Sequence, residues 1–369
     1  MMTSKERLLA AFRRQPVDRI PVTLYEFNTY SDNWTRKEPS YHPLLELQDK
    51  SGDTFVSASA GGGLMGDMNS VHRHSKLNSE KDELTETVVH TPRGPLNAIY
   101  RRSKNIATSW AIKHFIENDE DIERFLSIDY KFQPQDLSKL KRLEQKLGEN
   151  GVLLFGTGDP LGHIAGIFNF EEFVLRCYRD LAQIKIMLDK AALYIQDQID
   201  YINQHFSNVC FRLWGPEYAG APLMNPKKYF YPLVIEYVTP LVERIHAGGN
   251  FAIFHCHGML NDILEMIAET GCDVLEPLEV LPVLTADVTM RDIKQRIGDK
   301  ICLAGGMQAV DLDNGTPELI RTRVRQMIRD GGPEGLILLP TSAPLEIPLP
   351  NSIVENYRAA FEIANEMAC

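Results

Sequence analysis

Two histidines lie at the end of an apolar run that has the composition of a buried β-strand. Residues 251–258 read FAIFHCHG, so a single residue separates His255 from His257 and a glycine follows them. Strand side chains alternate between two faces. The two imidazoles therefore share one face and Cys256, expected to be a buried apolar thiol, points to the other. Paired imidazoles are ligands that Zn²⁺ prefers, and two structural histidines at a strand end are the simpler alternative.

Carboxylates follow other apolar runs at the corresponding point. Glu276 and Glu279 come after the next run along the chain, Glu217 after the preceding one, and Asp159 after an earlier one. Each acid alone is more often a loop or helix cap than a catalyst. Several acids beside two histidines on one edge instead predict a site for metal binding and proton transfer. The sequence leaves open whether Glu276 or Glu279 faces the histidines.

Apolar runs and helical patterns alternate from about residue 120 onward. The strand-like runs are 152–155, 209–214, 251–254, 273–275, 301–303 and 336–339. The helical patterns are 135–148, 170–206, 226–248, 259–270, 288–297, 316–331 and 351–367. This alternation indicates a parallel sheet with helices outside it, and no glycine fingerprint of a dinucleotide-binding fold follows a first strand. A TIM (β/α)₈ barrel is predicted, with its working residues at the carboxyl ends of the strands.

The N-terminal part does not show this alternation of strand-like and helical patterns. It is expected to contain an amphipathic helix, a β-like segment, an irregular aromatic stretch and a β-hairpin, at residues 4–14, 20–25, 28–79 and 85–102. The glycines at 61–63 lack the context of a phosphate-binding loop and are expected to form a plain loop. We therefore expect one domain over residues 1–369, in which 1–120 form the N-terminal segment and 120–369 the main barrel.

Composition excludes several classes of partner. With 39 basic and 50 acidic residues the net charge is −11, which argues against nucleic acid or an anionic membrane as partner. No apolar run approaches the roughly 18–20 residues that span a bilayer. The charged start does not resemble a signal peptide, and six dispersed cysteines are expected to be reduced thiols. A cytoplasmic location is expected.

Several motifs together resemble the uroporphyrinogen decarboxylase superfamily, specifically its methyltransferase branch. They are KER at 5–7, PVDRIPV at 16–22, WGPE at 214–217, HCHG at 255–258, GCDVLEPLE at 271–279, AGGM at 304–307 and GTPE at 315–318. The resemblance implies a TIM barrel, and residues 30–120 are not diagnostic. Porphyrinogen decarboxylases carry an arginine-rich motif after the first strand. Here residues 24–30 read LYEFNTY, without arginine, which disfavours a substrate with many carboxylates.

The zinc methyltransferases of this superfamily, and the similar cobalamin-independent methionine synthases, use a His-x-Cys pair, a glutamate and a second cysteine near the last strand. In this chain His255-x-His257 is followed by the 21 residues 258–278 and then by Glu279, which is the family spacing. His257 replaces the first cysteine, and Ser342 stands about where the second would be. The resemblance thus implies Zn²⁺ bound by His255, His257 and Glu279, without thiolates.

The missing thiolates favour a particular reaction. Thiolate-rich zinc suits activation of a thiol, whereas a His/His/Glu site is harder and more Lewis-acidic toward a neutral oxygen. We therefore expect methyl transfer from a methyl ether, with a methoxylated aromatic as the candidate donor, to cob(I)alamin on a partner corrinoid protein. Glu217 and Asp159 are the candidate catalytic acids, and Glu217 could instead orient a ligand histidine. No base-off cobalamin motif, Asp-x-His-x-x-Gly, occurs in the chain.

Other interpretations stay open at this level. A methyltransferase acting on a thiol or a methylamine, a decarboxylase-like lyase and a non-catalytic binding protein are the alternatives, and a homodimer is also open. The aromatic N-terminal stretch contains Tyr25, Phe27, Tyr30, Trp34 and Tyr41. These side chains either line a pocket for an aromatic ring or pack over the barrel. The identity of the methyl donor is not encoded in any motif.

Overall fold

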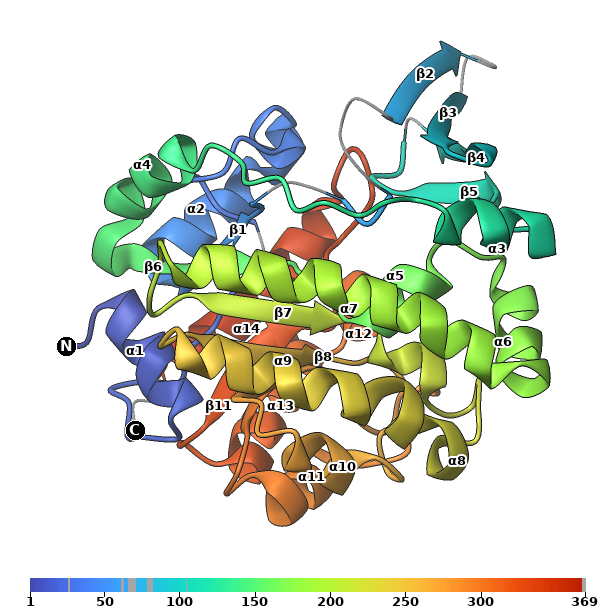
Figure 1. The fold of residues 1–369 in the computed structure, drawn as a ribbon. Coiled ribbons are helices and arrows are strands. Elements are labelled where there is room, and N and C mark those ends of the chain that lie inside the picture. The colour runs from blue at the N-terminus through green and yellow to red at the C-terminus, as the bar shows by residue number, and fades with distance from the viewer. Residues whose placement is uncertain (26, 61–62, 66–70, 78–81, 104, 367–369) are drawn as a thin grey trace.

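The computed structural model describes residues 1–369 except 26, 61–62, 66–70, 78–81, 104 and 367–369 (Figure 1). The loop expected at the glycine run therefore falls largely outside the described residues, as does Cys369. Within the described part, none of the helices is long and apolar enough to cross a membrane.

Among the described residues, seven parallel strands form one curled sheet in the order β1-β6-β7-β8-β9-β10-β11. The strands are β1 (Thr54–Ala58), β6 (Gly151–Phe155), β7 (Cys210–Trp214), β8 (Phe251–His255), β9 (Val274–Leu278), β10 (Cys302–Met307) and β11 (Leu336–Pro340). Every strand-like run predicted after residue 120 is present. The predicted barrel fold is confirmed.

The gap between β11 and β1 is filled by the segment around Val22, where the sequence predicts a β-like stretch. Val22 forms a parallel bridge with Leu338. The Thr23 amide donates to the Leu338 carbonyl (3.0 Å), and the Leu338 amide donates to the Pro21 carbonyl (2.8 Å). On the other side the Asp53 amide donates to the Val22 carbonyl (2.7 Å). This closing segment therefore hydrogen-bonds to both ends of the sheet and occupies the place of an eighth strand.

Helices cover the outer face of the sheet, and Figure 1 shows α7 and α9 lying over β7 and β8. The α-helices are α1 (Ser4–Phe12), α2 (His42–Ser51), α3 (Asp119–Leu126), α4 (Ser138–Leu147), α5 (Pro160–Ala165), α6 (Phe170–Arg179), α7 (Leu181–Asn203), α8 (Pro226–Phe230), α9 (Glu236–Ala247), α10 (Leu264–Glu269), α11 (Met290–Ile297), α12 (Ala309–Asn314), α13 (Pro317–Gly331) and α14 (Asn351–Glu366). The expectation that residues 28–79 are irregular was wrong at α2, at β1 and at β2 (Val71–Leu77). These elements are short and held by contacts with other segments, which local patterns do not reveal.

Side-chain caps fix where several helices begin. Thr3 and Glu6 form a reciprocal capping box at α1, in which each side chain accepts from the other residue's amide (3.1 and 2.8 Å). Asn225 and Thr316 cap α8 and α13 ahead of a proline. Asp180 leaves the helical conformation and caps α7, so the single helix predicted at 170–206 is two helices. Each such cap typically contributes about 1 kcal/mol.

The N-terminal region adds a second sheet. Among the described residues it is four-stranded and antiparallel, and it projects beyond the barrel at the upper right of Figure 1. Its strands are β2 (Val71–Leu77), β3 (Asp82–Thr91), β4 (Gly94–Ser103) and β5 (Ser109–Lys113). The predicted hairpin is the β3–β4 pair, with Thr91 opposite Gly94 at the turn. The sheet is larger than the hairpin that the sequence predicts.

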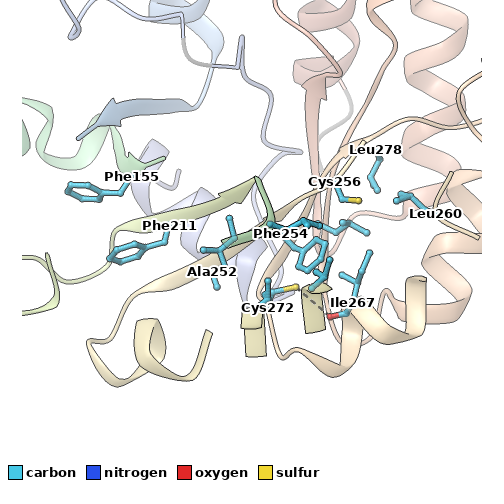
Figure 2. Close-up of a cluster of buried hydrophobic side chains, with 14 of the residues drawn as sticks. Phe155, Phe211, Ala252, Phe254, Cys256, Leu260, Ile267, Cys272 and Leu278 are labelled. Atoms are coloured by element: carbon cyan, nitrogen blue, oxygen red, sulfur yellow. Dashed lines mark hydrogen bonds between the residues drawn. The ribbon is translucent and has the colours of Figure 1, made fainter. Parts of the chain in front are cut away.

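Alternate residues of the strands enter two separate apolar clusters. Side chains such as Leu154, Ile253 and Ile337 fill the barrel interior, and Phe12 of α1 packs under them against Phe55 and Phe251, with ring centroids 6.2 and 5.2 Å apart. The intervening residues form the outer cluster, between sheet and helices, in which Figure 2 labels Phe155, Phe211, Ala252, Phe254, Cys256, Leu260, Ile267, Cys272 and Leu278. Burial of a side chain such as Phe12 contributes about 1.5–3 kcal/mol.

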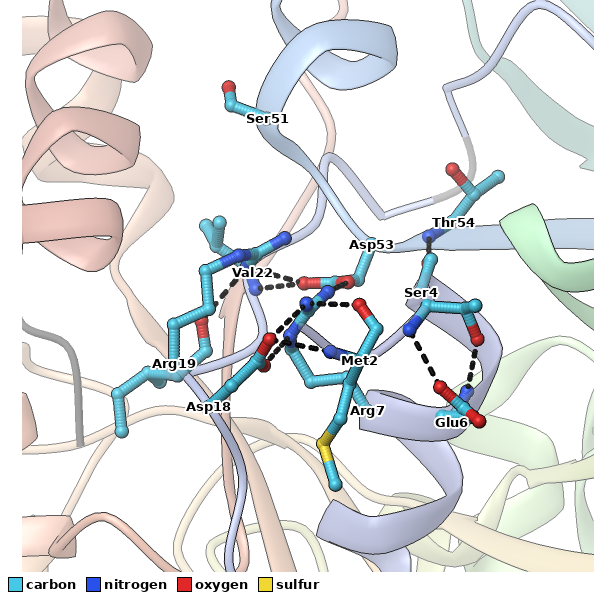
Figure 3. Close-up of polar contacts among 12 residues, drawn as sticks. Met2, Ser4, Glu6, Arg7, Asp18, Arg19, Val22, Ser51, Asp53 and Thr54 are labelled. Carbon is cyan, nitrogen blue, oxygen red and sulfur yellow. Dashed lines mark hydrogen bonds and ion pairs between the residues drawn. The ribbon is translucent and has the colours of Figure 1, made fainter.

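A buried ion network locks α1 and the closing segment to β1 (Figure 3). The fully buried Asp53 carboxylate accepts from Arg7 (2.6 Å), Arg19 (2.7 Å) and the Val22 amide (3.2 Å). Arg7 also donates to Asp18 (2.6 Å). The PVDRIPV motif thus supplies Asp18, Arg19 and the Val22 amide to this network, whereas Arg7 comes from α1 and Asp53 directly precedes β1.

We predict that Asp53→Asn lowers the free energy of unfolding by about 3–5 kcal/mol, because it removes the charge that compensates two buried or half-buried guanidinium groups. Urea unfolding followed by circular dichroism measures the change. Glu46→Gln, in an exposed pair with Lys50 at 3.7 Å, is the matched control and should change stability by less than about 0.5 kcal/mol. Equal effects of the two substitutions would contradict the role of Asp53.

Candidate active site

The two histidines continue the inner face of β8. Phe251, Ile253 and His255 alternate with residues of the outer cluster, so the His255 ring lies inside the barrel at the carboxyl end of the strand. The rings of His255 and His257 lie edge to face, with centroids 4.9 Å apart and an interplanar angle of 79°. Cys256 is buried in the outer cluster. The alternation predicted from the sequence is therefore present.

Glu276 lies beside His255 on the neighbouring strand. The β8–β9 register pairs these two residues, and His255 Nδ1 donates to Glu276 Oε1 (3.0 Å). The same oxygen accepts from Nε of Arg212, on β7. Burial by itself raises the pKa of Glu276, but the Arg212 charge and the His255 hydrogen bond outweigh it and lower the pKa to about 2. Glu276 is therefore an ionised carboxylate inside the barrel.

Glu279 makes the corresponding contact with His257. His257 Nδ1 donates to Glu279 Oε1 (3.2 Å), and the Gly258 amide donates to Glu279 Oε2 (3.1 Å). Burial lowers the pKa of His257, but the hydrogen bond and charge of Glu279 raise it above its ordinary value. Burial raises the pKa of Glu279, but the hydrogen bond from His257 brings it below its usual range. Each imidazole thus has its own carboxylate.

Asp159 and Glu217 lie next to one another at the ends of β6 and β7. The Asp159 amide donates to the Trp214 carbonyl (2.9 Å), and the Asp159 side chain caps α5 by accepting from the Gly162 amide (2.6 Å). Asp159 is fully buried, and its Oδ2 atom has no hydrogen-bond partner among the described residues. Burial, reinforced by the Glu217 charge, raises the pKa of Asp159 well above its ordinary value. Burial therefore favours the protonated form of Asp159, and Glu217, whose Oε2 accepts from the Gly215 amide (3.2 Å), is its partly exposed neighbour.

Ser342 and three of the N-terminal aromatic residues have partners other than the histidines and carboxylates of the site. Ser342 is exposed just beyond β11, and its hydroxyl donates to the Ala343 carbonyl (3.3 Å). The rings of Phe27, Trp34 and Tyr41 contact one another edge to face, with centroids 4.6–6.1 Å apart. The Tyr41 hydroxyl donates to backbone carbonyls of the loop after β11 (3.0 Å). These aromatic side chains pack over the barrel, the simpler of the two alternatives.

The structure brings together residues that local patterns did not single out. Arg212 lies in the apolar run CFRLW, two residues after Cys210, and therefore on the same inward face of β7. A charged residue on the inner face of a buried strand is the sequence feature that could have identified it. Its guanidinium stacks on the ring of Tyr25 at 4.7 Å from the centroid. Among the residues that the structure describes, no three His, Cys, Asp or Glu side chains form a group that could hold a metal ion as they stand.

These features define a class of protein: an α/β barrel with imidazole and carboxylate side chains gathered where its strands end. The profile of the uroporphyrinogen decarboxylase (URO-D) family matches residues 109–367. The chain belongs to the uroporphyrinogen decarboxylase family, which confirms the superfamily resemblance drawn from the motifs.

Curated relatives match only part of their length. The uroporphyrinogen decarboxylase of Shewanella pealeana is 31% identical over 172 residues, which cover 44% of this chain and 43% of that protein. That of Pseudoalteromonas translucida is 29% identical over 157 residues, or 40% and 39%. The chain thus matches less than half the length of these relatives. A methyltransferase from Methanosarcina mazei shares the fold, with a TM-score of 0.63 and 15% identity over 99% of both chains.

The accessibility of the cysteine thiols tests how the side chains around the strands are packed. Cys177, Cys210, Cys256, Cys272 and Cys302 are free and buried, and burial raises the pKa of each thiol. We predict that none is alkylated by iodoacetamide at neutral pH in the folded protein, whereas all react in urea. Peptide mass spectrometry on a Cys369→Ser variant measures this. Rapid labelling of Cys256 in the folded protein would contradict its position.

Proposed function

We propose that this protein is a zinc-dependent methyltransferase that moves a methyl group from a methyl ether, such as a methoxylated aromatic, to cob(I)alamin on a partner corrinoid protein. The observation that carries the proposal is the pair of adjacent imidazoles at the carboxyl ends of the strands, of which the inner one, His255, has Nδ1 bound to the Glu276 carboxylate while Glu279 lies beside His257. A carboxylate on one ring nitrogen is the arrangement that metal-ligating histidines favour, because it leaves Nε2 as the electron-pair donor.

The donor set is compatible with zinc. His255 and His257 supply Nε2 atoms that make no hydrogen bond with the described residues, and Glu279 supplies a carboxylate at the same edge. For Glu279 to act as the third ligand, one of its oxygens exchanges its hydrogen bond for the metal. When bound, zinc would act as a Lewis acid toward the ether oxygen.

The reaction balances without a further redox partner. The bond between the methyl carbon and the ether oxygen breaks, and a cobalt–carbon bond forms with the electron pair of cob(I)alamin. The departing oxygen takes a proton and leaves as an alcohol or phenol. Burial raises the pKa of Asp159 and so favours its protonated form, and the more exposed Glu217 lies between it and solvent beside the site. We assign proton supply to this pair.

We propose that a separate corrinoid protein carries the cobalamin; the given sequence contains no base-off cobalamin motif, which is compatible with this division of labour. We propose that the reaction takes place in the cytoplasm, a reducing compartment in which free thiols such as those buried here persist.

A decarboxylase-like lyase is the second candidate, because curated decarboxylases are similar to this chain over 157–172 residues. Against it, residues 24–30 contain no arginine to hold a carboxylate-rich substrate. Arg212, inside the barrel, is already paired with Glu276.

Methyl transfer is tested directly with zinc-loaded protein, a panel of methoxylated aromatics and a corrinoid protein reduced to cob(I)alamin. We expect the visible spectrum to change to that of methylcobalamin, with stoichiometric release of the phenol. Methylated thiols, methylamines and a porphyrinogen assayed for CO₂ release run in parallel, with the demethylated phenol as control. Glu217→Gln should lower kcat by about 10²–10⁴-fold, the range for loss of a proton donor. Activity on a thiol, an amine or the porphyrinogen alone would reject the ether.

The metal site is tested by zinc content. We predict that His257→Ala and Glu279→Gln each lose zinc and activity together, because each removes one of only three protein ligands. Ser342→Ala should keep normal zinc content, because its neutral, exposed hydroxyl is a poor ligand. Inductively coupled plasma mass spectrometry after gel filtration measures the stoichiometry. Full zinc occupancy and turnover in His257→Ala would show that the histidine pair is structural.

A further inference from the structure

The two histidine–carboxylate pairs differ in their surroundings. In the His255–Glu276 pair the side chains are 9% and 2% exposed, whereas in the His257–Glu279 pair they are 38% and 17% exposed. The inner pair also has a third member, Arg212, and the outer pair has no arginine or lysine among its described ion-pair partners. The two carboxylates are therefore suited to different tasks.

Arg212 fixes the position of Glu276. The β7–β8 register places Arg212 opposite Ile253, one inward position below His255, so its side chain crosses β8 to reach Glu276 on β9. Adjacent strands lie about 4.8 Å apart, so only a long side chain spans this distance. Arg212 is 6% exposed and Glu276 is 1% exposed. Moving the Glu276 carboxylate away would leave a buried guanidinium without this counter-charge, which proteins strongly avoid.

Tyr25 holds the other side of Arg212. Its ring lies over the guanidinium at 4.7 Å, a cation–π contact, and packs against the inner cluster. Its backbone has φ of 62°, in the left-handed region that non-glycine residues seldom occupy. A residue persists in this conformation when its surroundings over-determine it. The closing segment thus contributes to the position of Arg212.

The hydrogen bond between His255 and Glu276 dictates a tautomer. An ionised carboxylate only accepts hydrogen bonds, so the Nδ1 atom of His255 must carry the proton. We propose that Glu276, anchored by Arg212 and Tyr25, is a positioning residue that holds His255 with its proton on Nδ1 and its lone pair on Nε2. The inference rests on the proposed function for the use of that lone pair, and it assigns the glutamate that the sequence left open: Glu276 orients, and Glu279 is left to bind zinc.

The tautomer is measured in metal-free protein with ¹⁵N-labelled histidine, by long-range ¹H–¹⁵N correlation spectra that distinguish protonated from unprotonated ring nitrogens. We expect His255, assigned by loss of its signals in His255→Gln, to show a protonated Nδ1 and an unprotonated Nε2. Glu276→Gln should produce a mixture of tautomers, because a carboxamide can donate as well as accept. The matched control is Glu279→Gln, which should alter His257 and leave the His255 tautomer unchanged.

Zinc affinity, measured by competition with a chromophoric chelator, is the second readout. Glu276→Gln should weaken binding by about 10–100-fold, as loss of an orienting partner does, whereas Glu279→Gln should abolish stoichiometric binding. If Glu276→Gln does not fold, Arg212→Lys tests the same interaction. A lysine ammonium lacks the planar fork of donors with which arginine holds the carboxylate, so Arg212→Lys should also give a mixture of His255 tautomers.

The two proposals fail separately. If wild-type protein binds no zinc but keeps the predicted tautomer, the methyltransferase assignment falls and the positioning role stands. If His255 carries its proton on Nε2 alone, or if neither Glu276→Gln nor Arg212→Lys changes the tautomer, the positioning role is overturned whatever the zinc content. Loss of stoichiometric zinc in Glu276→Gln, with retention in Glu279→Gln, would also overturn it by exchanging the two roles.

Discussion

The carboxylate of Asp53 connects segments that lie far apart in the sequence. It accepts from Arg7 of α1, from Arg19 and from the Val22 amide of the closing segment, and it stands directly before β1. A curled parallel sheet becomes a barrel only when its edge strands are bridged, and these contacts hold the bridge between β11 and β1. At the amino ends of the strands Phe12 of α1 packs against Phe55 and Phe251, so the barrel interior there is apolar.

The charged residues at the carboxyl ends of the strands are themselves buried, with Arg212 6%, His255 7% and Glu276 1% exposed. Along β8 the inner face changes from Phe251 and Ile253 to His255, and along β9 it changes from Val274 to Glu276. Electrostatic interactions between such groups are much stronger than in water, because little solvent screens them. This constraint explains why the barrel holds Arg212 and Glu276 as a matched pair, and why burial raises the pKa of Asp159, which has no basic partner among the described residues.

The same fold serves different chemistries in this family because the reacting groups occupy only the last residues of a few strands. In this chain those positions hold two imidazoles with separate carboxylates. The inner carboxylate is immobilised by an arginine, whereas the outer one accepts from His257 and the Gly258 amide and has no arginine or lysine partner among the described residues. Such a site suits a metal centre in which the fixed carboxylate, Glu276, orients a histidine ligand and the other carboxylate, Glu279, binds the metal.

The sequence by itself determined the strand–helix alternation after residue 120, the barrel fold, and the common face of His255 and His257, because these depend on periodicities within a short stretch. It did not determine β1 or α2, nor the partners of Glu276. Arg212 lies 64 residues from Glu276 along the chain, and the register of three strands brings them together. A period of two specifies which face a side chain occupies, but only the packed sheet decides which side chains meet there.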